Sequence, residues 1–206
     1  MRLAFVDVET TGLDKPITSN GWPVYRVVEV ALTVANVTRD GVVIEHQLDF
    51  KQRFDRTKDA WTPKALEING YDDRPGAPWA DAPLRETPAA IAQWAKLVAL
   101  TNRLPLCSQN VPFDRAFLAG EVGRLNMRAG WGRRFVDLMS FSALIAVEHE
   151  MEDFGLHKVY AAMQGPPLPE HSAPADVTRG LHVFLEHHRR YFGVPALGVT
   201  PTPTPG

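Results

Sequence analysis

The sequence has one cysteine, no long apolar run and no excess of basic residues, and each of these absences excludes a class of protein. Because Cys107 is the only cysteine among 206 residues, an internal disulfide and a multi-cysteine metal site are both excluded. No apolar stretch approaches the roughly 20 residues of a membrane-spanning helix. The formal net charge of -2 excludes a broadly basic nucleic-acid clamp, but not a protein that contacts a few phosphates.

What the sequence does contain is enough apolar residues for one globular domain. It is 45% hydrophobic and 22% charged, which allows a sizeable core. Met1 and Arg2 lead directly into an apolar strand rather than a signal-peptide hydrophobic region with a cleavage site. We therefore expect an unprocessed cytoplasmic protein without a membrane partner. Low complexity is confined to the Pro/Thr-rich end, so we expect a folded domain at 1–195 and a tail at 196–206.

The hydrophobic pattern predicts that strands come first and that helices and strands then alternate. Short or alternating apolar runs indicate strands at 3–8, 27–37, 42–50, 104–108 and 134–138. Start signals and helical spacing indicate helices that begin near Thr62, Thr87, Pro112, Ser140, Leu156 and Ser172. Serine is a common capping residue, so we expect the Ser172 side chain to cap the last and longest helix. This order indicates an α/β fold with helices packed around one mixed sheet.

Two carboxylates lie within the first apolar run, "FVDVETTGL". Side chains two positions apart on a strand point to the same face, so Asp7 and Glu9 project together while Val6 and Val8 face the other way. Burying two unpaired carboxylates would cost several kcal/mol per ion, by the usual order-of-magnitude estimate. A positive group must therefore lie opposite them, and either a metal ion or an arginine would serve.

Two later segments supply further candidates for a site. Asp114 falls in the first turn of a helix that follows the fourth strand, near the sheet edge where α/β proteins place active sites. His171 precedes the last long helix, and Asp176 lies just over one turn inside it. Considered singly, each residue has a simpler interpretation, because acidic side chains favour helix N-termini and loop histidines are commonly solvated.

The combination indicates a specific chemistry. Four carboxylates are hard oxygen ligands that suit two Mg²⁺ or Mn²⁺ ions rather than a soft metal. A pair of such ions can stabilise both the attacking and the leaving oxygen of a displacement at phosphorus. Histidine, whose unperturbed pKa is about 6.5, is a natural base for activating water at neutral pH.

In this order, the motifs D-x-E-T-T-G-L, N-x-x-F-D and H-x4-D resemble the DEDDh branch of the DnaQ-like 3′-to-5′ exonucleases. The segments "YRVVEVALTV", "TPKALEINGY" and "GLHKVYAAM" look like the second strand, a short helix and the helix before the histidine in that family. The resemblance covers about 3–189 and includes the proofreading epsilon subunit of bacterial DNA polymerase III.

The resemblance implies a ribonuclease-H-like fold with a five-stranded mixed sheet, and a role for each matching residue. Those that would bind two divalent ions, Mg²⁺ or Mn²⁺, are Asp7, Glu9, Asp114 and Asp176. His171 would deprotonate the attacking water. Those that would contact the terminal nucleotide are Thr10, Thr11, Gly12 and Leu13, with Asn110 and Phe113 shaping the wall beside Asp114.

By this resemblance the chain removes nucleoside 5′-monophosphates from the 3′ end of single-stranded DNA, with proofreading and a DNA polymerase partner as its setting. One alternative is an RNA 3′-exonuclease of the ribonuclease T or oligoribonuclease type, because these motifs do not recognise the 2′-hydroxyl. Another is a catalytically silent scaffold on a polymerase, whose signature would be the loss of a ligand.

The chain departs from the family at three places. Gln109 and Asn69 stand where members often carry histidine, which affects substrate details rather than metal binding. The connection at 14–25 is longer than usual. One hypothesis is that Trp22 or Tyr25 stacks on the incoming strand, since aromatic faces stack on any base. The other is that Trp22 covers the edge of the core.

Overall fold

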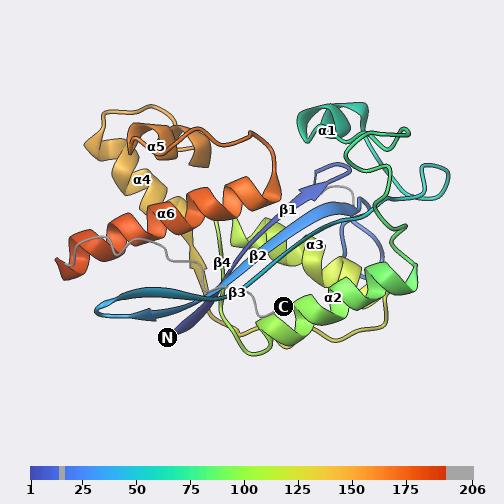
Figure 1. The fold of residues 1–206 in the computed structure, drawn as a ribbon, viewed down its shortest axis with the longest axis horizontal. Helices are drawn as coiled ribbons and strands as arrows, with labels where there is room; N and C mark the ends of the chain where they lie inside the picture. The colour runs from blue at the N-terminus through green and yellow to red at the C-terminus, as the bar shows by residue number, and fades with distance from the viewer. Residues whose placement is uncertain (14–16, 194–206) are drawn as a thin grey trace.

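The computed structural model of this chain describes residues 1–13 and 17–193. It is a five-stranded mixed sheet with helices on both faces, as Figure 1 shows. The α/β fold class expected from the sequence is therefore confirmed. The tail expected at 196–206 lies outside the described residues.

The first three strands form an antiparallel meander, and the last two lie parallel to the first. The strand order across the sheet is β3-β2-β1-β4-β5. The strands are β1 (Arg2–Thr10), β2 (Val27–Thr38), β3 (Gly41–Lys51), β4 (Leu106–Ser108) and β5 (Phe135–Asp137). The central position of β1 explains why its sequence is apolar on both faces.

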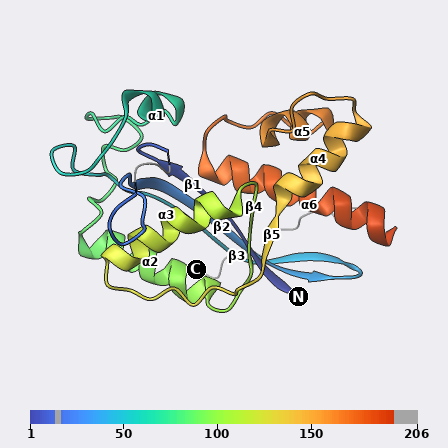
Figure 2. The ribbon, with the colours of Figure 1, turned by 180° about the vertical axis from the view of Figure 1, so that it is seen from behind.

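The helices form two layers, which Figures 1 and 2 show from opposite sides. One layer contains α2 (Pro88–Thr101) and α3 (Val111–Arg124), and the other contains α4 (Leu138–Glu148), α5 (Leu156–Ala162) and α6 (Ala173–Phe192). The short α1 (Pro63–Ile68) lies beyond the carboxyl end of β1. Among the described residues, no helix has the length and apolar character needed to cross a membrane.

Side chains on β1 alternate between the two cores. Ala4, Val6 and Val8 pack into the core beneath α2 and α3, which also contains Trp94. Leu3 and Phe5 pack into the core beneath α6. The same period of two continues past Phe5, so the next side chains on the α6 face are the two carboxylates of the D-x-E motif.

The start of α6 is stabilised by a residue from another element. Ser172 occupies the N-cap position, but its side chain makes no capping hydrogen bond, so this part of the sequence prediction is wrong. Instead the Ala173 amide donates to Oε2 of Glu29 in β2 at 3.0 Å. A buried carboxylate therefore satisfies a helix N-terminal amide, and the favourable interaction with the helix dipole adds to the bond.

Candidate active site

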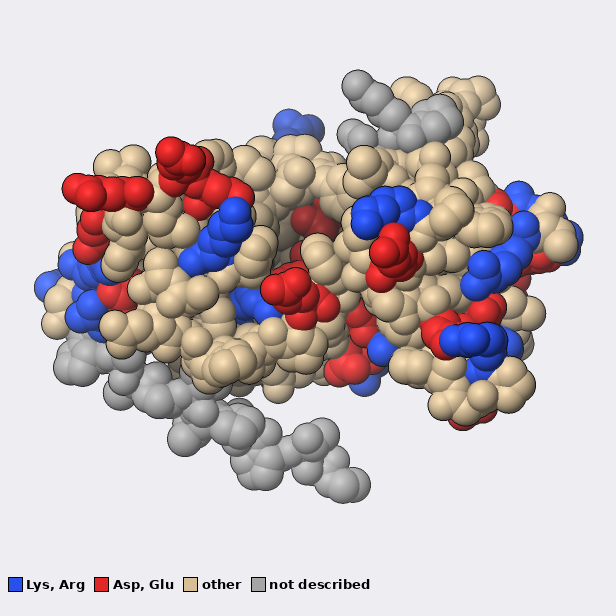
Figure 3. All heavy atoms as spheres, turned by 90° about the horizontal axis from the view of Figure 1, so that it is seen from above, with Lys and Arg blue, Asp and Glu red and all other residues tan. Residues whose placement is uncertain are grey.

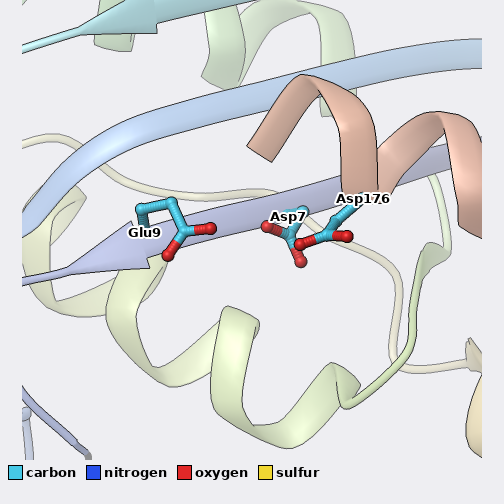
Figure 4. Close-up of side chains that lie close together, drawn as sticks. All are labelled: Asp7, Glu9 and Asp176. Carbon is cyan, nitrogen blue, oxygen red and sulfur yellow. The ribbon is translucent and has the colours of Figure 1, made fainter. Parts of the chain in front are cut away.

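Three of the predicted carboxylates converge at the carboxyl half of β1. Asp7 and Glu9 project from the strand, and Asp176 projects toward them from the first turns of α6 (Figure 4). Each offers a carboxylate oxygen, and these atoms all lie within 4.8 Å of one another. Residues 169 positions apart in the sequence thus share one small volume that could hold a cation.

The fourth carboxylate approaches from the other helical layer. Asp114 lies in the first turn of α3 and is only 3% exposed. β4 pairs with β1 at Ala4 and Phe5, so Val8 lies beyond that pairing, where its amide lowers the pKa of the Asp114 carboxylate. Asp114 is also close enough to raise the pKa of Asp7. The four predicted metal ligands therefore come from β1, α3 and α6.

The site concentrates negative charge out of water. Burial raises the pKa of Asp7 well above its usual range, and repulsion from Asp114, Asp176 and Glu9 raises it further. Burial and the neighbouring carboxylates raise the pKa of Glu9 to about 8. Burial also raises the pKa of Asp114 to about 7, although the Ser108 side chain and the Val8 amide oppose the shift.

These pKa values reflect a shortage of positive charge. Within the described residues, the single ion pair made by the four carboxylates joins Asp176 Oδ1 to Arg179 Nη1 at 2.5 Å. Burial raises the pKa of Asp176 despite that contact. The second oxygen of the Asp176 carboxylate is not part of the pair. Neutralising four acids requires more than one arginine, and hard oxygen donors suit divalent cations.

A hollow of about 190 Å³ opens over the carboxylates. Its walls are formed by Asp7, Gln109, Leu156, His157, Glu170, His171, Asp176 and Arg179. Figure 3 views the face that carries α1 and α5 and shows a hollow near its middle, with acidic side chains on the floor. The space is open to solvent on one side, so an extended ligand could enter end first.

His171 lies at the rim of this hollow, as the sequence predicted for a base beside the metal ligands. Its side chain is exposed, and its backbone has φ of 49°, in the left-handed region that few non-glycine residues adopt. Such strained residues persist where the surrounding structure holds them, and they cluster at functional sites. Because the backbone at His171 is strained, contacts with other parts of the chain must hold the segment before it in place.

The turn after β1 is held by a dense set of hydrogen bonds. The Thr10 hydroxyl donates to the Gly12 carbonyl at 2.6 Å. The Thr11 hydroxyl donates to the Ala60 carbonyl at 2.6 Å and accepts the Arg26 amide at 2.9 Å. Thr11 is fully buried, and its side chain supports the turn. Direct contact with a ligand by Thr10, Thr11, Gly12 and Leu13 stays a prediction.

The remaining predicted contact residues lie around the same end of the sheet. Leu13 is 73% exposed, as a residue that wedges against a base would have to be. Asn110 stands at the N-cap position of α3 without a side-chain capping bond. Phe113 is half-buried, with its ring centroid 4.7 Å from that of Phe117. Their positions are compatible with the predicted roles, which stay predictions.

Trp22 and Tyr25 pack against the protein. A β-carbon on Gly12 would lie 2.5 Å from the Tyr25 ring, so glycine is required there for the ring to pack on the turn. A β-carbon on Gly123 of α3 would lie 2.4 Å from the Trp22 ring. The structure thus favours the second hypothesis for Trp22, in which it covers the edge of the core.

The two residues that stand where the family often has histidine both have structural roles. Asn69 Nδ2 donates to the Thr10 carbonyl at 2.9 Å and so supports the turn after β1. Gln109 Oε1 accepts the Ser142 hydroxyl at 3.0 Å, and its Nε2 donates to the Phe154 carbonyl at 3.3 Å. Gln109 therefore connects the end of β4 to α4 and to the loop before α5.

Sequence reasoning missed Glu29, His157 and Arg179. Glu29 is 4% exposed and adds its charge to the field acting on Asp7 and Glu9. Its signal was present in the sequence, because it is a lone acid within the apolar run "VVEVALTV". His157, at the start of α5, lines the hollow, but one histidine on a surface helix gives no signal. Arg179 likewise looks like an ordinary helical arginine.

No protein-family model matches this sequence, and no curated protein matches it. Solved structures do match the fold. Exonuclease I of E. coli, in complex with a dT13 oligonucleotide, superposes with a TM-score of 0.67 at 17% identity, covering 93% of this chain and 42% of exonuclease I. The chain therefore spans less than half the length of that enzyme.

Two further neighbours are shorter. The nuclease domain of 3′hExo, a DEDDh family member bound to rAMP, has a TM-score of 0.61 at 10% identity. The match covers 97% of this chain and 97% of that domain. S. pombe Pop2p, in its Mg²⁺- and Mn²⁺-bound form, has a TM-score of 0.60 at 14% identity, covering 92% of this chain and 84% of Pop2p. At these identities the likeness establishes the ribonuclease-H-like fold, which confirms that expectation.

Proposed function

We propose that this chain is a divalent-metal-dependent 3′-to-5′ exonuclease that releases nucleoside 5′-monophosphates from single-stranded nucleic acid. The observation that carries the proposal is the grouping of the Asp7, Glu9 and Asp176 carboxylates within 4.8 Å of one another. Asp114 lies close enough to raise the pKa of Asp7, and His171 lines the same hollow as Asp7 and Asp176. The known structures with this fold include an exonuclease with bound dT13, a nuclease domain with bound rAMP, and Pop2p with bound Mg²⁺ and Mn²⁺.

The donor set fits two divalent ions. Asp114 is buried and the other three carboxylates are half-buried; together they are crowded and short of positive charge, which is the environment that a bound cation would neutralise. Asp7 is close enough to the other three acids for each of them to raise its pKa. The residues that would hold the ions are Asp7, Glu9, Asp114 and Asp176. When bound, such ions neutralise charge on the scissile phosphate and on the attacking and leaving oxygens.

The protein's own groups would position the substrate and move one proton. His171 would accept the proton of the attacking water through an imidazole nitrogen, and its exposed position lets it pass that proton to solvent. The turn after β1 would receive the terminal nucleotide, with Leu13 against the base. Because a site for one or two nucleotides needs few phosphate contacts, the net charge of -2 is compatible with a polyanionic substrate.

The proposal is tested by digesting single-stranded DNA and RNA labelled at the 5′ end, with and without Mg²⁺. We expect stepwise shortening from the 3′ end, release of 5′-monophosphates, and no activity after Asp7→Ala. RNA is the alternative substrate, because neighbours of this fold bind both DNA and ribonucleotides. Degradation of neither polymer by the parent chain would favour the silent scaffold. The presence of all five site residues and the grouping of three of the carboxylates argue against that alternative.

For a DNA substrate we propose proofreading beside a polymerase as the physiological setting. The relative rates on matched, mismatched and ribonucleotide 3′ termini test this role. Faster removal of a mismatched deoxynucleotide than of a matched one would support it. Equal rates, or a preference for ribonucleotide ends, would point to RNA processing instead.

A further inference from the structure

We propose that Arg179 is a positioning residue that holds Asp176 and the segment before His171 in one fixed arrangement. This inference rests on the proposed function of the same site, because it assigns Asp176 to the metal and His171 to the water. It adds a component that none of the motifs contains. Arg179 acts through its neighbours and needs no contact with substrate.

The geometry begins with helix periodicity. Residues three apart on α6 lie on one face, so Arg179 lies about one turn beyond Asp176. Side chains on a helix lean toward its N-terminus, so the Arg179 side chain extends toward Asp176. Arg179 Nη1 donates to Asp176 Oδ1 at 2.5 Å. The rest of the guanidinium continues past the helix start to the preceding loop.

There, Arg179 Nη2 donates to two backbone carbonyls, at 2.7 Å to Leu168 and at 2.8 Å to Pro169. The loop contains three prolines, at positions 166, 167 and 169, which have no amide to donate and cannot join a strand or helix ladder. Arg179 therefore supplies hydrogen bonds that the prolines of the loop cannot donate. Pro169 is two residues from His171, so the same guanidinium fixes the approach to the strained histidine.

Arg179 is a buried residue that links several segments, rather than a partner in a surface ion pair. Its side chain is 4% exposed, and its guanidinium carbon lies 6.0 Å from the Tyr160 ring centroid in α5. An arginine is the residue suited to this position, because a planar fork of donors can serve a carboxylate and a carbonyl pair together. A lysine ammonium on a flexible stem cannot span both groups in the same way.

A matched arginine in the same helix provides the control. Arg189 pairs with Glu186, also three residues before it, and the two groups are 2.5 Å apart. That pair is more exposed, with 44% of the arginine side chain accessible, and it lies far from the hollow. Glu186 also pairs with Arg190 at 2.7 Å. Arg179→Met and Arg189→Met therefore each remove one ion pair between residues three apart on α6, and only the first touches the site.

Three measurements on the full chain test the proposal: hydrogen exchange of the amides at 165–172, Mn²⁺ affinity by calorimetry, and kcat and KM on a single-stranded oligonucleotide. Arg179→Met should accelerate exchange in that segment and lower kcat about 10- to 100-fold, the usual effect of losing an outer-shell partner, while KM changes little. Arg179→Lys should recover part of the activity, and Arg189→Met should match the parent.

The results that overturn the proposal are equally specific. The proposal is overturned if Arg179→Met has amide exchange rates at 165–172 and a kcat that are both within twofold of the parent. Tighter Mn²⁺ binding with unchanged kcat would also overturn it, since Arg179 would then act only as a competing charge. If Arg179→Met does not fold, Arg179→Lys carries the same comparison. The exchange measurement needs neither metal nor catalysis, so an inactive parent chain would refute the proposed function without deciding the role of Arg179.

Discussion

Glu29 in β2 accepts the Ala173 amide at the start of α6, across 144 residues of sequence. Glu29 also lies 3.4 Å from Lys51 Nζ, and Glu9 is its partner across the β1–β2 ladder. The contact places the first turn of α6 against the strands that bear the site. Asp176, three residues after Ala173, thereby reaches Asp7.

Replacing Glu29 should separate its roles as a hydrogen-bond acceptor and as a charge. Glu29→Gln keeps a carbonyl oxygen for the Ala173 amide, whereas Glu29→Leu leaves that buried amide unpaired, which costs about 1–3 kcal/mol. Both variants remove the same charge, so their difference isolates the bond. We expect the melting temperature of Glu29→Leu, measured by circular dichroism, to lie below that of Glu29→Gln by about 2–4 °C for each kcal/mol of stability lost. Equal melting temperatures would show that the bond does not hold α6.

Thermal stability of the metal-free protein should fall as pH rises. The folded pKa values of Glu9 and Asp114, about 8 and about 7, exceed their ordinary values of 4.5 and 3.8, so the folded chain holds these protons more tightly than the unfolded chain. Their contribution is complete below about pH 4 and is lost as pH rises through 7 to 8. In chelator, the melting temperature should decrease between pH 5 and 9.

Adding Mg²⁺ should reverse that loss, and more strongly at pH 8 than at pH 5.5, because the ligands must be deprotonated to bind. Asp7→Asn removes one charge from the cluster and should flatten the pH dependence in chelator. A metal-free melting temperature that is constant or rises over this range would contradict the electrostatic account of the site.

Much of this fold followed from local patterns. Alternation and apolar runs placed the strands, and Thr62 and Thr87 do cap helices with proline at the first position. These signals work because they depend on neighbours within a few residues. Ser172 failed as a cap because Glu29, a residue distant in sequence, took its place, and such competition cannot be judged from the local sequence.

The same distinction between local patterns and distant contacts applies to the candidate site. Strand periodicity predicted the common face of Asp7 and Glu9. The first-turn positions of Asp114 and Asp176 alone indicated no site, and the order of the motifs in the sequence suggested their role. The contacts that hold these groups involve backbone atoms of remote loops, such as the carbonyls that bind Arg179. Only the folded chain reveals which side chain reaches them.

Removing the imidazole should impair catalysis without impairing metal binding. His171→Ala should lower kcat about 10²- to 10⁴-fold, the usual contribution of general-base catalysis, and leave the Mg²⁺-induced rise in melting temperature unchanged. His149→Ala is a suitable control, since His149 is exposed at the end of α4 and does not line the hollow. A His171→Ala variant with kcat within threefold of the parent would exclude His171 as the base.

Trp22 should matter for stability and not for the substrate. Its ring packs on α3 at Gly123, and the Arg124 guanidinium carbon lies 5.7 Å from the ring centroid. We expect Trp22→Ala to destabilise the fold by about 1–3 kcal/mol, less than a fully buried tryptophan because Trp22 is half-buried, with KM for an oligonucleotide within twofold of the parent. A tenfold higher KM at unchanged stability would instead support contact with the strand.

The most direct test of the account is the number of Mn²⁺ ions that the metal-free protein binds, measured by calorimetry at pH 7.5 in the parent and in Asp7→Asn. We predict two ions for the parent, bound with release of protons because the carboxylates begin partly protonated, and loss of that binding in the variant. No binding by the parent, or equal binding by both proteins, would contradict the claim that these carboxylates form one metal centre.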